Sequence, residues 1–311
     1  MKYYWLKLAE FLSRVFPRRV AYGVARRIAD GYVLFDRQGR ENVIGNLQRI
    51  HAHSGVTLSR RALRVLAREN FLNFAKYLVD FFHFMHIDPE RARRLTNFEE
   101  VRGVLDKLLE RGKGIVFLSA HLGNWELGAA VIAQSGYKFN TIVLWQPDAK
   151  LNKLYQNYRT KRCINPIPFG RAARGALAAL RRNEIVGLAG DRDFTGARET
   201  FAFFGQPARL PSGPAKLALT SGAAILPIVL VRNADDTFRY VWETAIIPDR
   251  EHDTVESLMQ RMAASLERLI SAHSEQWYLF HDLWNIEVDH ALAAVAAFGE
   301  APGSEPQHAH E

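Results

Sequence analysis

From about residue 112 onward, short runs of apolar, β-prone residues alternate with stretches of helical character. Each run is continuously apolar, which is typical of strands that are buried on both faces of a sheet. The runs cover residues 115–118, 141–144, 167–169, 185–189 and 224–231. This pattern predicts an α/β fold with a mostly parallel central sheet flanked by helices.

The loops that follow these strands are expected to lie along one edge of the sheet. Right-handed crossovers place the carboxyl ends of parallel strands together, and open α/β sheets bind their ligands at that edge. Two polar loops, at residues 119–126 and 190–196, follow the first and fourth runs. Farther along, residues 237–247 are predicted to form an edge or antiparallel strand, and residues 254–272 an amphipathic helix.

The first loop reads Ser-Ala-His-Leu-Gly-Asn-Trp-Glu. His121 leaves the strand end, Gly123 permits a tight turn, and Asn124 is a suitable cap for the next helix. The Glu126 carboxylate can then fold back onto one nitrogen of the His121 ring, an arrangement typical of a general base. The alternatives are a histidine that only hydrogen-bonds backbone, a structural His–carboxylate pair, and a metal site. No third ligand stands nearby in the sequence, and we expect no metal.

The second loop carries Asp191, Arg192 and Asp193 directly after a strand. Two carboxylates and an arginine in this position can hold a polar headgroup, and the arginine suits a phosphate or a carboxylate. The alternative is a charged turn closed by Gly196. The sequence contains neither a P-loop nor the G-x-S-x-G elbow of serine hydrolases.

The 311-residue chain carries 41 Lys and Arg against 33 Asp and Glu, a formal charge of +8. Such an excess suits an anionic membrane surface, nucleic acid, or simply a solvated surface rich in arginine. No run of five basic residues and no nucleic-acid-binding signature is present, so we expect no nucleic-acid partner. The single cysteine, Cys163, excludes an internal disulfide framework.

Residues 1–16 place aromatic and aliphatic side chains at helical spacing, with basic residues at other positions. Pro17 is expected to end this helix or to open the next one. No apolar run approaches the about 20 residues of a spanning helix, and Glu10 and Arg14 argue against a signal peptide. We predict that residues 1–30 dock on an anionic membrane surface; packing against the protein's own domain is the alternative.

Three regions follow from this organisation. Residues 1–95 are expected to be an N-terminal helical region that includes the docking segment, and residues 96–288 an α/β domain. Residues 289–311, rich in proline, glycine and polar residues at the end, are expected to be disordered. Within the first region, residues 57–86 form an aromatic-rich helix whose side chains either line a groove for an acyl chain or belong to the core.

Four segments carry a resemblance to a known family. They are His-Leu-Gly-Asn-Trp-Glu at 121–126, Gly-Asp-Arg-Asp at 190–193, Ile-Leu-Pro-Ile-Val at 225–229, and residues 277–284. On these motifs, over residues 10 to 285 or so, the chain resembles the bacterial lipid A late acyltransferase family. That family includes lauroyl and myristoyl transferases and the mycobacterial phosphatidylinositol mannoside acyltransferase. Residues 277–284 lack the arginine-rich sequence of the lipid A branch and are closer to the mannoside acyltransferase, which leaves the acceptor lipid open.

The resemblance implies an enzyme that moves a fatty acyl group from acyl carrier protein or coenzyme A to a hydroxyl of a membrane glycolipid or phospholipid. His121 would remove the hydroxyl proton and Glu126 would orient its ring. We expect backbone N–H groups around Gly123 and Asn124 to stabilise the oxyanion. The family implies no metal or redox cofactor beyond the thioester co-substrate, and a peripheral position on the cytoplasmic face of the cell inner membrane.

The residues expected to bind the substrates are Asn124, Arg159, Arg162, Asp191, Arg192 and Asp193. Arg159 or Arg162 would meet donor phosphates, whereas Asp191 and Arg192 would contact the acceptor headgroup or position the reacting groups. Two alternatives are a thioesterase or lipid esterase that uses the same His–Glu pair, and a lipid-binding protein without catalytic activity. Addition of acceptor lipid distinguishes a transferase from the esterase, and loss of His121 distinguishes either enzyme from the binding protein.

Overall fold

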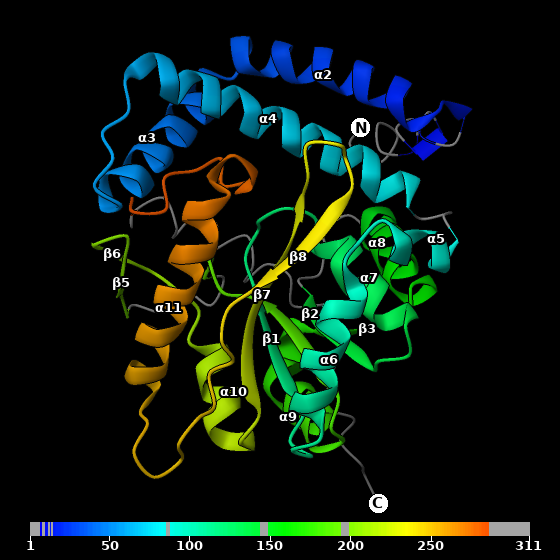
Figure 1. Cartoon of the computed structure of the whole chain (residues 1–311), viewed down its shortest axis with the longest axis vertical. Helices are drawn as coiled ribbons and strands as arrows, with labels where there is room; N and C mark the ends of the chain where they lie inside the picture. Colours follow the sequence, from blue (N-terminus) through cyan, green and yellow to red (C-terminus); the bar gives the residue numbers. More distant parts are fainter. Residues whose placement is uncertain are drawn as a thin grey trace, which may run out of the picture.

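The computed structural model describes residues 7, 10, 11, 13, 15–84, 88–143, 149–193 and 199–285. Within these residues a group of helices precedes an α/β unit (Figure 1). The helices are α2 (Arg18–Phe35), α3 (Arg37–His53), α4 (Arg60–His83), α5 (Pro89–Arg94), α6 (Phe98–Leu109), α7 (Trp125–Gln134), α8 (Ala149–Lys161), α9 (Ala172–Arg181), α10 (Gly213–Ser221) and α11 (Val255–Ala272), with short 3-10 turns η1 (Phe169–Arg171) and η2 (Ser274–Gln276). The strands are β1 (Ile115–Ser119), β2 (Phe139–Val143), β3 (Ile164–Pro168), β4 (Ile185–Ala189), β5 (Phe201–Phe203), β6 (Gln206–Ala208), β7 (Ala224–Arg232) and β8 (Phe238–Trp242).

Six of the strands form one sheet in the order β3-β2-β4-β1-β7-β8. All neighbouring pairs are parallel except β7 and β8, which pair antiparallel at the edge. The predicted α/β class and its mostly parallel sheet flanked by helices are therefore confirmed. The edge or antiparallel strand expected within 237–247 is also found, as β8.

Helices cover both faces of this sheet. In β1, Ile115 and Phe117 join a core that includes α6 and α7, whereas Val116 and Leu118 join the core of α9, α10 and α11 on the other face. Successive residues of a strand point to opposite faces, so a strand covered on both sides needs apolar residues throughout. This burial explains the continuous apolar runs of the sequence.

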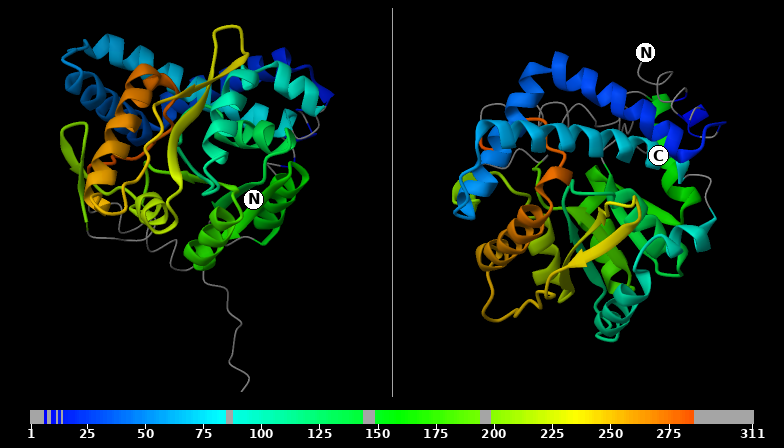
Figure 2. Two further views of the ribbon diagram at one scale, coloured as in Figure 1. Left: turned by 60° about the horizontal axis from the view of Figure 1, so that its bottom comes forward. Right: turned by 45° about the horizontal axis from the view of Figure 1, so that its top comes forward.

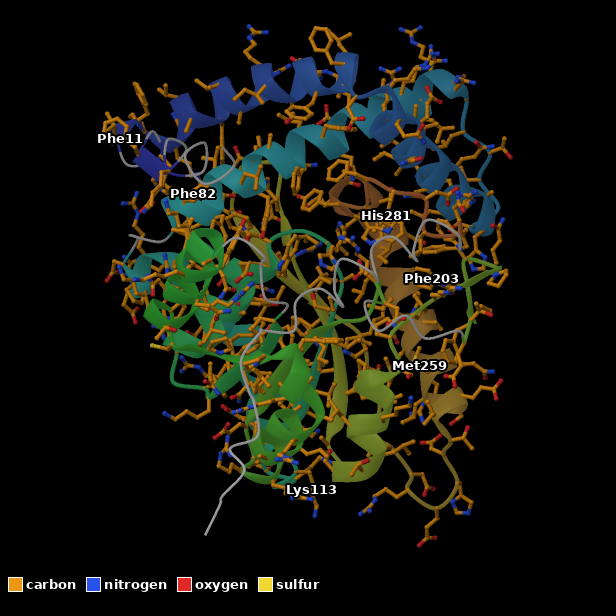
Figure 3. All side chains as sticks on the ribbon, turned by 180° about the vertical axis from the view of Figure 1, so that it is seen from behind. Phe11, Phe82, Lys113, Phe203, Met259 and His281 are labelled. Carbon is orange, nitrogen blue, oxygen red and sulfur yellow. The ribbon has the colours of Figure 1, made fainter. Side chains whose placement is uncertain are left out.

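The helices α2, α3 and α4 gather at one end of the molecule in every view (Figures 1 and 2). Lys113, two residues before β1, lies at the opposite end (Figure 3). The carboxyl ends of the parallel strands therefore point toward α2, α3 and α4. This is the end at which the two polar loops leave the sheet.

Several predicted elements have the expected positions. The helices predicted at 57–86 and 254–272 are α4 and α11, and Pro17 is the residue that precedes α2. The hairpin of β5 and β6 and the helix α10 have no counterpart among the predicted elements. Most of the segment 1–16, and the whole of 289–311, lie outside the described residues. Among the helices that the structure describes, none is long and apolar enough to cross a membrane.

Candidate active site

The two polar loops meet because their strands are neighbours in register. Ser119 at the end of β1 is paired with Ala189 at the end of β4, and the Gly190 N–H donates to the Ser119 carbonyl at 2.8 Å. His121 and Asp191 each lie two residues beyond these paired ends. The sequence expectation that both loops share one edge of the sheet is confirmed.

Asp191 holds His121 with both carboxylate oxygens. The His121 backbone N–H donates to Oδ2 at 2.8 Å, and the ring Nδ1 lies 2.9 Å from Oδ1. A carboxylate accepts only, so Nδ1 carries the proton and Nε2 keeps its lone pair for a reacting group. The His121 side chain keeps 22% of its surface exposed, whereas Asp191 has none.

A third group fixes this carboxylate. The Trp277 indole Nε1 donates to Asp191 Oδ2 at 2.9 Å. Burial alone would raise the pKa of Asp191, but the nearby His121, its two hydrogen bonds and the Trp277 indole together lower that pKa to about 2. Asp191 therefore stays ionised at neutral pH and stabilises a proton on the His121 ring.

Glu126 does not occupy the position expected from its spacing. Its Oε1 accepts a hydrogen bond from Arg159 Nη2 at 2.6 Å, and both side chains are largely buried. The predicted contact between Glu126 and His121 is therefore wrong in this structure. The physical reason is that Glu126, in the first turn of α7, extends toward α8, while Asp191 from the neighbouring strand already takes Nδ1.

The turn between His121 and α7 is confirmed in its local chemistry. Gly123 has φ +67°, and the Asn124 side chain caps α7 by accepting from the Leu127 N–H at 3.1 Å. The backbone N–H groups of these two residues, however, donate to the Gln276 and Leu230 carbonyls at 2.9 and 2.7 Å. The expected oxyanion site made of these N–H groups is therefore wrong, because both donors are already engaged.

One donor in this turn is uncommitted. The Asn124 Nδ2 is fully buried and has no hydrogen-bond partner, and the whole residue is only 2% exposed. A buried amide N–H without a partner costs free energy, so this donor is available to any acceptor that can reach it.

Arg159 lies within α8 and Arg162 directly after it, and their environments differ. Burial alone would lower the pKa of Arg159, but the bound Glu126 raises that pKa above its ordinary value. Arg162 is 2% exposed, and its Nη1 lies 3.3 Å from Gln134 Oε1, with the guanidinium beside the Tyr158 ring. Burial lowers the pKa of Arg162. The sequence left open which of the two arginines meets the donor phosphates, and the structure shows that they differ in burial and in hydrogen-bond partner.

Arg192 and Asp193 continue the loop after Asp191. Asp193 is 8% exposed, and the charge of Arg192 acts on the neighbouring ring of His281. Burial, and then Arg192, lowers the pKa of His281 to about 4, so that this ring is neutral at pH 7. His281 has no role among the sequence expectations, yet it lies within electrostatic reach of both Asp191 and His121.

The segment 275–281 connects the His121 loop to the N-terminal helices. On one side the Tyr278 N–H donates to the His121 carbonyl at 2.8 Å. On the other side, four side-chain amides from α3 and α4 donate to its backbone carbonyls. They are Asn42 to Phe280 (2.9 Å), Asn46 to Leu279 and His281 (3.1 and 2.9 Å), Asn70 to Trp277 (2.7 Å) and Asn73 to Glu275 (3.2 Å). Trp277 lies in one of the four segments that carry the family resemblance, but no role was predicted for it or for the asparagines.

Aromatic residues of α4 lie beside the site. Tyr77 stacks on Trp125 with ring centres 4.4 Å apart, and Trp125 meets the His121 ring edge to face at 5.3 Å. Tyr77, Phe71 and Phe81 are buried. Phe71 joins the core of the N-terminal helices and Phe81 packs on Tyr158 of α8, so these members of the 57–86 region form core. Over the residues described, no group of three His, Cys, Asp or Glu side chains is placed to hold a metal ion.

The chain is similar in sequence to known acyltransferases. Residues 1–285 match the model of the family described as bacterial lipid A biosynthesis acyltransferase. The phosphatidylinositol mannoside acyltransferase of Mycobacterium tuberculosis is 27% identical over 231 residues, which are 71% of each chain. The enzyme of that name from Mycolicibacterium smegmatis is 24% identical over 225 residues, 70% of this chain and 72% of its own. The chain therefore belongs to the bacterial lipid A biosynthesis acyltransferase family, and it is an acyltransferase.

Proposed function

We propose that this protein is an O-acyltransferase that moves a fatty acyl group from acyl carrier protein or coenzyme A to a hydroxyl of a membrane glycolipid or phospholipid. The observation that carries this proposal is the His121 ring, bound through Nδ1 to a buried ionised carboxylate and still partly exposed. The relatives named as phosphatidylinositol mannoside acyltransferases support a glycosylated phospholipid as the class of acceptor.

In the proposed reaction His121 is the general base. Its Nε2 takes the proton of the acceptor hydroxyl while the hydroxyl oxygen forms a bond to the thioester carbonyl carbon. The tetrahedral intermediate then expels the thiolate, and the His121 imidazolium returns the proton to that sulfur. Asp191 stabilises the imidazolium, a contribution that together with general base catalysis is about 10²–10⁴-fold.

The other groups are assigned by their positions and by their partners. Asn124 Nδ2 is the candidate donor to the oxyanion, because it lies in the turn after His121 and has no hydrogen-bond partner. Arg159, fixed by Glu126 and partly exposed, is the candidate for the donor phosphate, since Arg162 is almost fully buried. Arg192 and Asp193, in the loop after β4, are the candidates for the acceptor headgroup.

We further propose a peripheral position on the cytoplasmic face of the cell inner membrane. Nine large apolar side chains between residues 11 and 35 are exposed: Phe11, Val15, Phe16, Val20, Val24, Ile28, Tyr32, Leu34 and Phe35. Basic residues accompany them, with Arg19, Arg26 and Arg27 exposed on α2. An apolar stripe beside arginine suits the headgroup region of an anionic bilayer.

The test of the function uses purified protein with palmitoyl-CoA or a palmitoylated acyl carrier protein, and a phosphoinositol mannolipid or phosphatidylinositol as acceptor. We expect esterified lipid by mass spectrometry, and a loss of turnover of about 10²-fold or more in both His121→Ala and Asp191→Asn. Asp191→Asn should reduce kcat with little change in KM, because Asp191 acts by stabilising the protonated His121 ring and does not bind the substrate.

Two controls make this test decisive. Thermal unfolding of both variants checks that a loss of turnover is not a loss of fold. Full turnover by His121→Ala would refute the assignment of the base. Release of free fatty acid at a rate that added acceptor does not divert would show a hydrolase instead of a transferase.

A further inference from the structure

The positive charge of this chain is concentrated in one segment. Residues 149–183 contain nine Lys and Arg residues and no Asp or Glu. These residues are Lys150, Lys153, Arg159, Lys161, Arg162, Arg171, Arg174, Arg181 and Arg182. The remainder of the chain carries 32 basic and 33 acidic residues, so this segment accounts for the entire positive excess.

The segment folds into one edge of the sheet. It comprises α8, β3, η1 and α9, and β3 is the last strand at that edge. Five of its basic side chains are exposed and form no ion pair with any residue that the structure describes: Lys153, Lys161, Arg171, Arg174 and Arg181. Exposed like charges that no ion pair neutralises create a surface potential that draws an anionic partner and speeds its encounter.

This surface reaches the edge of the sheet at which the His121 loop leaves it. Arg159 of α8 extends inward to Glu126 in the first turn of α7. The ends of β2 and β3 are in register at Val143 and Pro168, and Arg171 and Arg174 follow directly after β3. Both arginines therefore lie at the carboxyl end of the sheet, the end at which the His121 loop also leaves it.

The same surface is unsuited to a lipid bilayer. None of the large apolar side chains that the structure describes as exposed lies within residues 149–183, whereas nine lie within residues 11–35. Binding in the headgroup region needs an apolar face in addition to charge.

We propose that the exposed face of α8, β3 and α9 is the docking surface for an acidic acyl carrier protein, which presents its acyl thioester to His121. The inference rests on the proposed function and goes beyond it by choosing the carrier protein as donor and by naming the surface. Association through exposed charges depends strongly on salt, because the Debye length falls from about 10 Å at 0.1 M to about 3 Å at 1 M.

The experiment reverses two charges on this surface. Arg171→Glu/Arg174→Glu is compared with Arg61→Glu/Arg64→Glu, an equal change at two exposed arginines three residues apart on α4. Binding of a fluorescently labelled palmitoyl-acyl carrier protein is measured by anisotropy, and turnover is measured with that carrier and with palmitoyl-CoA. We expect the first variant to weaken carrier binding and kcat/KM about tenfold or more at low salt, with unchanged kcat, and the control to resemble the wild type.

The other readouts separate the possible explanations. Turnover of palmitoyl-CoA and flotation with anionic vesicles should be unchanged in both variants. Unaltered carrier binding in Arg171→Glu/Arg174→Glu would overturn the proposal, as would an equal loss with palmitoyl-CoA, which would assign the surface to the phosphates of that donor. Loss of vesicle flotation alone would assign it to the membrane. If the wild type transfers no acyl group from either donor, the proposed function fails, whereas the anisotropy measurement still decides the docking surface.

Discussion

At the scale of single residues, the arrangement of the site follows from which carboxylate reaches His121. Glu126 is close in sequence, but a side chain in the first turn of α7 extends toward Arg159. Asp191 is 70 residues away from His121 and nevertheless binds both its backbone N–H and its ring. Parallel pairing of β1 with β4 brings these residues together, so the strand register rather than local spacing selects the partner of the base.

Gly123, in the turn between His121 and α7, leaves no room for a side chain. A Cβ at this position would lie 2.1 Å from the Leu230 carbonyl oxygen, and φ is +67°. We expect Gly123→Ala to lower the free energy of unfolding by more than the about 1–3 kcal/mol of a strained backbone alone, and to reduce turnover. Chemical denaturation and acyl transfer measure the two effects.

Gly112 offers a matched control for this prediction. It has the same φ of +67°, but an added Cβ there would meet nothing within 4 Å. Gly112→Ala should therefore show the backbone cost alone and keep its activity. Equal stability of the two variants would mean that contact with the Leu230 carbonyl does not constrain the turn.

At the scale of elements, α2 distributes its side chains in an unusual way. Its buried residues are Tyr22, Ala25 and Ala29, of which two are small, whereas Val24 and Ile28 are 50% and 55% exposed. Burial of large apolar groups is the main favourable term in folding, and a row of exposed apolar groups is typical of a surface that contacts something else. Within the proposed function that surface is the membrane.

Charge placed on this face of α2 should weaken membrane binding. We expect Val24→Glu/Ile28→Glu to reduce the fraction of protein that floats with anionic vesicles, because the substitutions remove apolar contact and repel the anionic headgroups. Val56→Glu/Val65→Glu, at positions 46% and 57% exposed outside α2, changes the charge equally and should leave flotation unchanged. The same loss in both variants would mean that net charge, and not α2, controls binding.

At the scale of the whole molecule, a buried polar cluster joins the N-terminal helices to the sheet. Asp80 of α4 pairs with Arg232 at the end of β7, and the Tyr22 hydroxyl of α2 donates to Asp80 at 2.5 Å. The Arg232 Nη1 in turn donates to that hydroxyl at 2.8 Å. Burial alone would lower the pKa of Arg232, but Asp80 raises it above its ordinary value, so the guanidinium stays charged.

Removal of one charge from this cluster should be costly. Asp80→Asn leaves the buried Arg232 without its counter-charge, and we expect a loss of about 3–5 kcal/mol in the free energy of unfolding. Asp80→Asn/Arg232→Met removes both charges and should recover much of that loss. Denaturant titration of the two variants measures the difference. A double variant as unstable as Asp80→Asn would show that the unpaired charge is not the cause.

The sequence pattern alone was sufficient to predict the class of fold and to identify the two loops that form the site. Continuous apolar runs require a sheet covered on both faces, and parallel strands bring His121 and Asp191 to the same edge whatever the lengths of the helices between them. The local chemistry of Gly123 and Asn124 was likewise predictable, because a turn and a helix cap depend on neighbours in the chain. The hairpin of β5 and β6 was missed because its strands are only three residues each and show no clear period.

Only the tertiary structure decided which groups are partners. The pairing of Asp191 with His121 depends on strand order. The N–H groups of Gly123 and Asn124 cannot serve as oxyanion donors because they bind the carbonyls of residues 276 and 230, more than a hundred positions away. Hydrogen bonds of this kind join segments that are far apart in the sequence, and no local pattern in either segment indicates that they will meet. The local pattern of apolar and polar residues therefore determines the helices, the strands and the loops between them. The packing of strands and helices determines which hydrogen-bond donor meets which acceptor.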